Sequence, residues 1–190
     1  MKRLKHLFYR YLKDLAIEAE YRAQFSRSTL SEGPSDVVVC MTSYPARIDN
    51  AWLAIESLFR QSYKDFRIVL VLARDQFPGE KLPRMIRRQI KKGLKILWQS
   101  HDKGSFDHLW PAVVNFPDSR VISVDDDKFF PSDLVAQLVA ASESKPGTVI
   151  GARGWAIVSR DEVIEFQGGW ERANPATPSD KLFMPPGNGS

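Results

Sequence analysis

Three consecutive aspartates follow an apolar run in this 190-residue chain, in the stretch Val-Ile-Ser-Val-Asp-Asp-Asp-Lys. Carboxylates that leave a buried strand together repel one another and lose hydration, so a cation is expected to neutralise them. Mg²⁺ or Mn²⁺ fits, because each takes one or two protein carboxylates, several waters and substrate phosphate oxygens. If the strand continues through the triplet, Asp125 and Asp127 share a face and hold the metal, while Asp126 points away. The alternative is a solvated acidic turn in which Lys128 is the ion-pair partner and Ser132 caps the next helix.

Short apolar segments alternate with helical segments along the chain and would position these aspartates. Four runs rich in Val, Ile and Leu predict buried parallel strands, at Val37–Met41, Ile68–Leu72, Leu94–Trp98 and Val121–Val124. A segment with apolar residues at helical spacing follows each run. The first helix is predicted after the candidate caps Asp49 and Asn50, and the second over 81–92 with Gly93 as its C-terminal cap. The third is predicted around Leu109, Ala112 and Val113, and the fourth from Ser132 onward. This alternation predicts an α/β fold with a mostly parallel sheet flanked by helices. Further strands are expected at Val149–Arg153, Trp155–Val158 and Val163–Phe166.

Polar and charged residues follow all four predicted strands, in the stretches Thr42–Arg47, Ala73–Asp75, Ser100–Ser105 and Asp125–Asp127. Ligands of parallel sheets bind outside the carboxyl ends of the strands, where the loops converge, so this edge is the expected crevice. Neither a P-loop nor a glycine-rich dinucleotide motif occurs, and no Ser-His-Asp or Cys-His arrangement can be placed at this edge. We interpret His101 and His108 as polar loop and helix residues, and Cys40 as a small core residue.

The composition, with 43% hydrophobic and 26% charged residues, is typical of a soluble globular chain. No apolar run approaches the roughly 18 residues of a transmembrane helix. The net charge of +4 lies entirely in residues 1–30, with seven Lys or Arg and three Asp or Glu, so the basic pI does not indicate nucleic-acid binding. One cysteine forms no internal disulfide, which fits a reducing, cytoplasmic compartment.

Residues 1–25 predict a basic amphipathic helix, because apolar side chains recur at helical spacing with Lys and Arg outside the stripe. The stripe consists of Leu4, Leu7, Phe8, Tyr11, Leu12 and Leu15. It either packs on its own domain or on a second copy, or adsorbs to an anionic membrane surface, which would make the protein membrane-peripheral. Residues 1–30 are therefore interpreted as helix and linker, and residues 31–190 as the main domain.

The order of these motifs resembles that of nucleotide-sugar glycosyltransferases with the GT-A fold, particularly family-2-like bacterial enzymes that open with Thr-Ser-Tyr-Pro-x-Arg-Ile. That segment stands here at Met41–Ile48, and the Asp-x-Asp (DXD) metal motif at Val124–Asp127. The likeness covers about residues 37–190. It implies a Rossmann-like GT-A domain that uses Mn²⁺ or Mg²⁺ to transfer a sugar from a nucleoside diphosphate to a glycan or other hydroxyl acceptor. The resemblance favours a UDP-sugar as the donor.

By this resemblance, the donor nucleotide contacts the loop after the first strand, and an acidic residue after the second strand binds its base. The implied donor-binding residues are Thr42, Ser43, Tyr44, Arg47, Asp75, Lys103, Asp125 and Asp126, and the implied metal ligands are Asp125 and Asp127. Asp125 would contact the ribose, and a cation such as Arg47 or Lys103 would stabilise the charge on the leaving diphosphate.

An inverting transferase also needs a carboxylate base to accept the proton of the acceptor hydroxyl. In the family this base follows a glycine-containing acceptor loop that Pro185–Ser190 resembles, so the domain is interpreted as C-terminally short. Four acidic residues follow the metal motif, but their spacing selects none as the base: Asp161, Glu162, Glu165 and Glu171. Two alternatives therefore stay open, a nucleotide-sugar-binding module without a base and, least favoured because Thr42–Arg47 contains no glycine, a nucleotidyltransferase.

Overall fold

The computed structural model describes residues 14–30, 33 and 35–151, and the backbone of five residue pairs between Trp155 and Met184. The side chains of Ser105 and Phe106 are also outside the description. The chain divides into two compact units, Met1–Asp133 and Leu134–Ser190. Residues 1–13 of the predicted amphipathic helix, the candidate bases Asp161, Glu162 and Glu165, and the Pro185–Ser190 loop lie outside the described residues.

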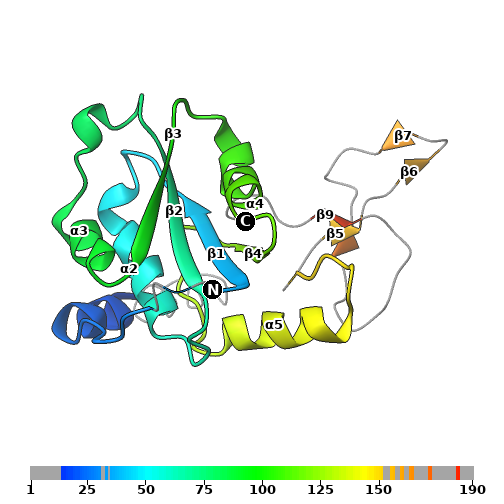
Figure 1. The fold of residues 1–190 in the computed structure, drawn as a ribbon, viewed down its shortest axis with the longest axis horizontal. Coiled ribbons are helices and arrows are strands. Elements are labelled where there is room, and N and C mark those ends of the chain that lie inside the picture. Colours follow the sequence, from blue (N-terminus) through cyan, green and yellow to red (C-terminus); the bar gives the residue numbers. More distant parts are fainter. Residues whose placement is uncertain are drawn as a thin grey trace, which may run out of the picture. The chain divides into compact units, whose positions relative to one another are not determined.

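A four-stranded parallel sheet forms the centre of the first unit (Figure 1). Its strands are β1 (Val37–Thr42), β2 (Arg67–Ala73), β3 (Leu94–Gln99) and β4 (Arg120–Ser123), in the order β3-β2-β1-β4. All three pairings are parallel, with Val39 beside both Ile68 of β2 and Ile122 of β4. Each of the four apolar runs therefore forms the predicted strand, and the α/β, Rossmann-like class is confirmed.

Helices cover both faces of this sheet, α2 (Ile48–Phe59) and α3 (Arg84–Ile90) on one side and α4 (Trp110–Asn115) on the other (Figure 1). Two short 3₁₀ helices, η1 (Pro78–Glu80) and η2 (Gly104–His108), lie in the connections. The predicted caps Asp49 and Asn50 are wrong, because α2 already begins at Ile48, with Arg47 in the capping position and no side-chain cap. Gly93 follows α3 with a φ of 105°, a conformation that favours glycine.

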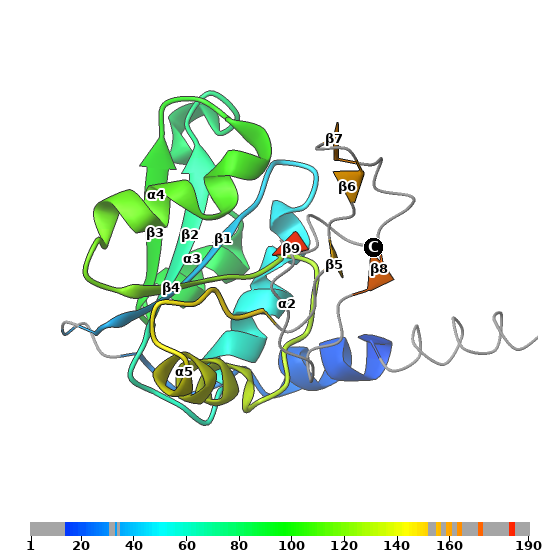
Figure 2. The ribbon, with the colours of Figure 1, turned by 90° about the vertical axis from the view of Figure 1, so that its right-hand side faces the viewer.

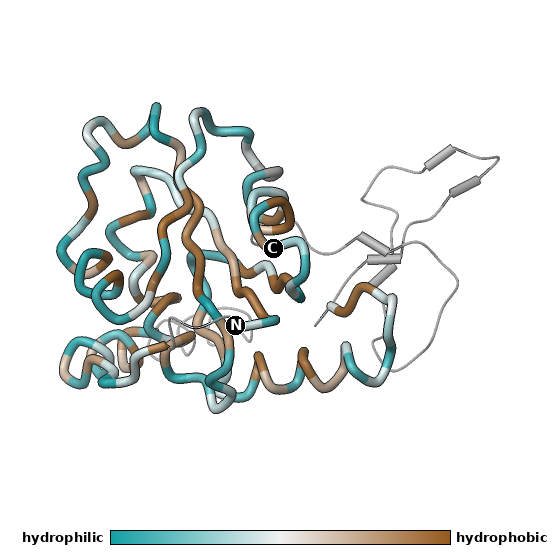
Figure 3. Tube along the Cα trace, viewed as in Figure 1, coloured by the Kyte–Doolittle hydropathy of each residue, from teal (hydrophilic) through white to brown (hydrophobic). Residues whose placement is uncertain are grey.

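The core of this unit is built from the strands, which are largely apolar in Figure 3, and from the buried side of α2. Val38, Cys40, Val69 and Val71 pack against Ala112 of α4 on one face. Cys40 is fully buried, and burial raises the pKa of its thiol to about 12. The interpretation of Cys40 as a core residue is therefore confirmed.

Residues 14–23 are helical, and the segment that follows runs along the first unit. The Phe25 ring stacks on Trp52 of α2, with the ring centroids 6.4 Å apart, and the Leu30 amide donates to the Lys92 carbonyl. Within the described part of the chain, no helix combines the length and apolar character needed to cross a bilayer.

The second unit begins with α5 (Leu134–Ser144), which matches the helix predicted from Ser132 onward. Beyond it, β5 (Trp155–Ala156), β8 (Glu171–Arg172) and β9 (Phe183–Met184) form a three-stranded antiparallel sheet. A separate antiparallel pair joins β6 (Ser159–Arg160) to β7 (Val163–Ile164). The strands expected at Trp155–Val158 and Val163–Phe166 are described at Trp155–Ala156 and Val163–Ile164. The strand expected at Val149–Arg153 is wrong for residues 149–151, which form no strand, and residues 152 and 153 lie outside the described residues.

Candidate functional site

The order of the strands creates one distinctive place at the carboxyl edge of the sheet. From β1 the chain builds outward through β2 to β3, and it then returns to add β4 on the other side of β1. The connections after β1 and β4 therefore leave neighbouring strands in opposite directions. Open α/β sheets bind ligands at such a switch point, because the diverging connections leave a crevice between them.

Side chains from these two connections contact each other at the switch point. The Ser43 hydroxyl after β1 donates to Oδ2 of Asp126 after β4 over 2.6 Å. Arg47, which leads into α2, places Nη1 at 3.2 Å from Oδ1 of Asp126 and at 3.2 Å from Oδ2 of Asp127. Figure 2 shows the two segments, one rising from β1 toward α2 and the other leaving β4. Ser43 and Arg47 precede Asp126 by 83 and 79 positions in the sequence, yet the three side chains form one polar cluster.

Asp126 is the most buried of the three aspartates. Only 7% of its surface is exposed, whereas Asp127 is exposed and Asp125 is half-buried. The expectation that Asp126 points away from its neighbours does not hold, because the strand geometry it required ends at Ser123. The Val124 amide still donates to the Cys40 carbonyl, after which residues 126 and 127 form a turn that directs Asp126 toward Ser43.

Two basic side chains pair with Asp126 and Asp127 in this structure. Arg47 bridges Asp126 and Asp127, and the Nζ atom of Lys128 lies 3.5 Å from Oδ1 of Asp127. The hydrogen bond with Asp126 raises the pKa of the Arg47 guanidinium above its ordinary value. Arg47 also lies over the Tyr44 ring, at 5.6 Å from the centroid. The Lys128–Asp127 ion pair is the one expected for a solvated acidic turn, and it is compatible with a metal site as well.

The carboxylates that remain can supply part of a metal site. Among the described residues, no group of three His, Cys, Asp or Glu side chains is arranged to enclose an ion. Asp125 makes no hydrogen bond or ion pair with the described residues, and Asp127 shares its two oxygens between Arg47 and Lys128. Two carboxylates fit Mg²⁺ or Mn²⁺ that keeps its waters and binds substrate phosphate oxygens, but not an ion held by protein alone.

The Thr42 hydroxyl anchors the start of the loop after β1. It donates to the Val71 carbonyl of β2 over 3.0 Å. The Tyr44 carbonyl then accepts from the amides of Arg47 and Ile48, so the loop turns directly into α2. Tyr44 is 44% exposed. This geometry leaves an aromatic face and a guanidinium beside the acidic turn.

Asp75 and Lys103 belong to a different group, at the ends of β2 and β3. Oδ2 of Asp75 lies 3.3 Å from Nδ1 of His101, and Gln76 donates to Asp102 over 2.6 Å. The Lys103 amide donates to buried Asp107. No described contact links these residues to Ser43, Arg47 or Asp126.

Sequence reasoning passed over two participants in this outer group. His101 pairs with Asp75, although the sequence indicated only a polar loop histidine. Asp107 is 3% exposed and holds the loop after β3 through the Lys103 amide, while its Oδ1 atom has no hydrogen-bond partner among the described residues. The sequence indicated this role for Asp107 only weakly, because an aspartate four residues after a lysine also occurs on exposed helices. Buried Asp107 therefore became visible only in three dimensions.

Comparison with known proteins finds no matching family model and no matching curated protein sequence. Among solved structures, the chain is similar to the mannosyltransferase PcManGT from Pyrobaculum calidifontis in complex with GDP-Man and Mn²⁺. The identity is 17% and the TM-score 0.46, over 77% of this chain and 43% of that one. It is also similar to residues 1–349 of TarS from S. aureus, at 15% identity and a TM-score of 0.42, over 65% of this chain and 42% of that one.

TarS in complex with UDP-GlcNAc gives 14% identity and a TM-score of 0.41, over 65% of this chain and 40% of that one. This chain thus spans less than half the length of each of these structures. At such identities the likeness concerns the fold alone.

Proposed function

We propose that this chain contains the donor-binding part of a metal-dependent glycosyltransferase, and that the switch point between β1 and β4 receives a nucleoside diphosphate sugar. The observation that carries the proposal is the convergence of Ser43, Arg47 and the acidic turn at this edge of the sheet. The resemblance of Met41–Ile48 and Val124–Asp127 to glycosyltransferase motifs supports the same assignment.

The loop after β1 offers the groups that a nucleotide diphosphate requires. The exposed Tyr44 ring provides a flat surface for a base or ribose. Arg47 is 45% exposed and presents its remaining N–H groups to solvent, where they can donate to diphosphate oxygens. Ser43 and Asp126 hold one another at the bottom of this arrangement, so we assign them to positioning the loop against the acidic turn.

Asp125 and Asp127 are the residues that would hold Mn²⁺ or Mg²⁺, and the ion would supply charge neutralisation for the leaving diphosphate. Arg47 supplies a second positive charge on the same side. Only Nη1 of Arg47 contacts Asp126 and Asp127, so if a metal takes Asp127, this atom can exchange that carboxylate for a phosphate oxygen while the other N–H groups bind further oxygens. Phosphate and carboxylate present similar acceptor geometry to guanidinium, so this exchange keeps its hydrogen bonds.

Calorimetric titration of UDP, GDP and TDP, each with and without Mn²⁺, tests the proposal. We expect Mn²⁺-dependent binding of one nucleotide, weakened about ten-fold or more by D127N, since a charge-assisted contact contributes about 1.5–3 kcal/mol. The matched control is D118N, because Asp118 is an exposed aspartate in the turn before β4, at the opposite edge of the sheet. Absence of binding to every nucleotide, or equal effects of the two variants, would refute the site.

Donor hydrolysis measured on the same chain separates an enzyme from a binding module. Mn²⁺-dependent release of the sugar, reduced in D127N, supports a transferase. Tight nucleotide binding without any turnover instead supports a module that binds the donor and lacks a base.

A further inference from the structure

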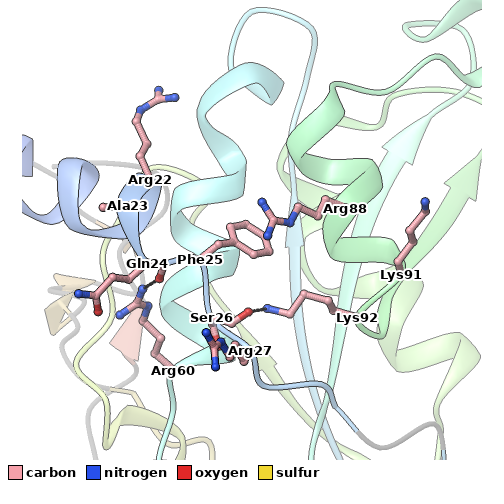
Figure 4. Close-up of a pocket in the computed structure, with 10 residues that line it drawn as sticks. All are labelled: Arg22, Ala23, Gln24, Phe25, Ser26, Arg27, Arg60, Arg88, Lys91 and Lys92. Atoms are coloured by element: carbon pink, nitrogen blue, oxygen red, sulfur yellow. Dashed lines mark hydrogen bonds between the residues drawn. The ribbon is translucent and has the colours of Figure 1, made fainter.

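A strongly basic cavity lies at the opposite edge of the sheet from the candidate donor site. Its volume is about 920 Å³. The lining residues come from the end of the N-terminal helix and the segment after it, and from the ends of α2 and α3. They are Arg22, Ala23, Gln24, Phe25, Ser26, Arg27, Arg60, Arg88, Lys91 and Lys92 (Figure 4). Lys92 precedes β3, and Arg60 precedes β2, so this basic pocket lies at the amino ends of those strands.

Positive charge dominates the basic pocket. Six of its ten lining residues are Arg or Lys, and none is Asp or Glu. Arg22 pairs with Glu18, and Arg60 pairs with Glu20 and Glu56. Within the part of the chain that the structure describes, no ion pair joins Arg27, Arg88 or Lys91 to a carboxylate. Three of the cations that line this pocket therefore have no ion-pair partner among the described residues.

The surrounding structure holds several of these cations in place. The Phe25 ring lies between the Arg88 guanidinium, 4.0 Å from its centroid, and Lys92 Nζ at 4.5 Å. Lys92 also donates to the Ser26 carbonyl, and Arg60 donates to the Gln24 carbonyl (Figure 4). A ligand that binds here meets positive groups whose side chains are already ordered, which lowers the entropic cost of binding.

Lys92 shows the electrostatic cost of this arrangement. Burial lowers the pKa of its ammonium group, and the nearby charges of Arg88, Arg60 and Lys64 lower the pKa further, while Glu56 opposes them. A negatively charged ligand would relieve this repulsion. Guanidinium groups bind phosphate oxygens in a bidentate manner, so phosphate is the anion that these side chains suit best.

We propose that the basic pocket binds a phosphate-bearing anion with at least two negative charges, supplied either as a free molecule or as a lipid headgroup. The site is separate from the carboxyl edge and needs no divalent metal. The sequence before it carries further positive charge, with Lys2, Arg3, Lys5, Arg10 and Lys13 all within the first 13 residues. Attraction of an anion to this end of the chain is therefore long-range as well as local.

Calorimetric titration with inorganic pyrophosphate in the presence of EDTA tests the basic pocket while metal-dependent binding elsewhere is suppressed. We expect R88Q and K91Q each to weaken pyrophosphate binding, by about ten-fold for R88Q, because a charge-assisted hydrogen bond contributes about 1.5 kcal/mol or more. R87Q is the matched control, because Arg87 is the adjacent exposed arginine of α3 and does not line the pocket. Circular dichroism checks that all three variants fold.

The variants give a clear result in either direction. Pyrophosphate binding that R88Q and K91Q weaken and R87Q leaves unchanged supports the proposal, as does weakening of that binding at higher ionic strength. Absence of pyrophosphate binding, or equal losses in R87Q and R88Q, overturns it. These outcomes are independent of D127N, so failure here and failure of the donor site can be told apart.

Sedimentation with vesicles distinguishes the source of the anion once pyrophosphate binding is established. Vesicles of phosphatidylcholine with one-fifth phosphatidic acid present phosphate monoesters at a surface, and pure phosphatidylcholine vesicles are the control. Sedimentation with the mixed vesicles that R88Q reduces supports binding of a lipid headgroup. Pyrophosphate binding without R88Q-sensitive sedimentation supports a soluble anion.

Discussion

Replacing Asp126 by alanine should destabilise the fold far more than the same replacement of Asp127. The Asp126 carboxylate is 7% exposed and accepts the Ser43 hydroxyl over 2.6 Å, so its loss leaves a buried donor without a partner. A buried hydrogen bond to a charged group contributes about 1.5–3 kcal/mol. The half-exposed Arg47 pairs add only about 0.5 kcal/mol each. We therefore expect D126A to lower the free energy of unfolding by about 2–3 kcal/mol, and D127A by less than about 0.5 kcal/mol.

Urea denaturation followed by circular dichroism measures both values on the whole chain. The pairwise part of the effect comes from a double-mutant cycle between S43A and D126A, for which we expect a coupling of about 1.5 kcal/mol. If D126A and D127A destabilise the chain equally, or if the cycle gives no coupling, Asp126 is not the buried anchor of the acidic turn and the reasoning about this turn fails.

Three further predictions concern other parts of the first unit. Cys40 should resist Ellman's reagent at pH 8 in the folded chain and react after unfolding; because its pKa is raised from 9.0 to about 12, stability should also fall above about pH 9, and rapid native labelling would contradict this. G93A should cost about 2 kcal/mol in thermal or urea unfolding, because φ is 105° and a Cβ atom would lie 3.2 Å from the Leu30 carbonyl oxygen, whereas G104A, with a φ of 61° and no atom within 4 Å, should cost less. E56A should speed hydrogen exchange of the Ser26 amide, which donates to the buried Glu56 carboxylate, and an unchanged rate would contradict that contact.

The strands of the sheet were predictable because each one is an unbroken run of apolar residues. Val37–Met41 and Ile68–Leu72 are apolar on both faces, which is what a central parallel strand requires. The order of the strands was not predictable in the same way, since no residue of β4 indicates that this strand pairs with β1 and not with β3. That order arises from how the connecting helices pack, and it determines that Ser43 and Arg47 meet the acidic turn.

The location of the candidate site was therefore predictable to the level of the sheet edge, but its internal contacts were not. The roles of Asp125 and Asp126 depended on extending β4 past Ser123, and the chain turns there instead. The prediction of Asp49 and Asn50 as caps of α2 was wrong for a related reason, because the hydrogen bonds from the Arg47 and Ile48 amides to the Tyr44 carbonyl start the helix before Asp49. In both cases a turn or a tertiary contact, and not the local sequence pattern, determined where the element begins or ends.

The attachment of residues 24–30 has a practical consequence for protein engineering. Their anchors are the Ser26 amide on Glu56, the Phe25 ring on Trp52 and the Leu30 amide on Lys92. A shortened chain that starts at residue 31 would uncover a tryptophan and leave an acid inside the protein without its main hydrogen-bond donor. Crystallisation and expression trials should therefore place the start of the chain ahead of residue 24, so that these anchors are retained.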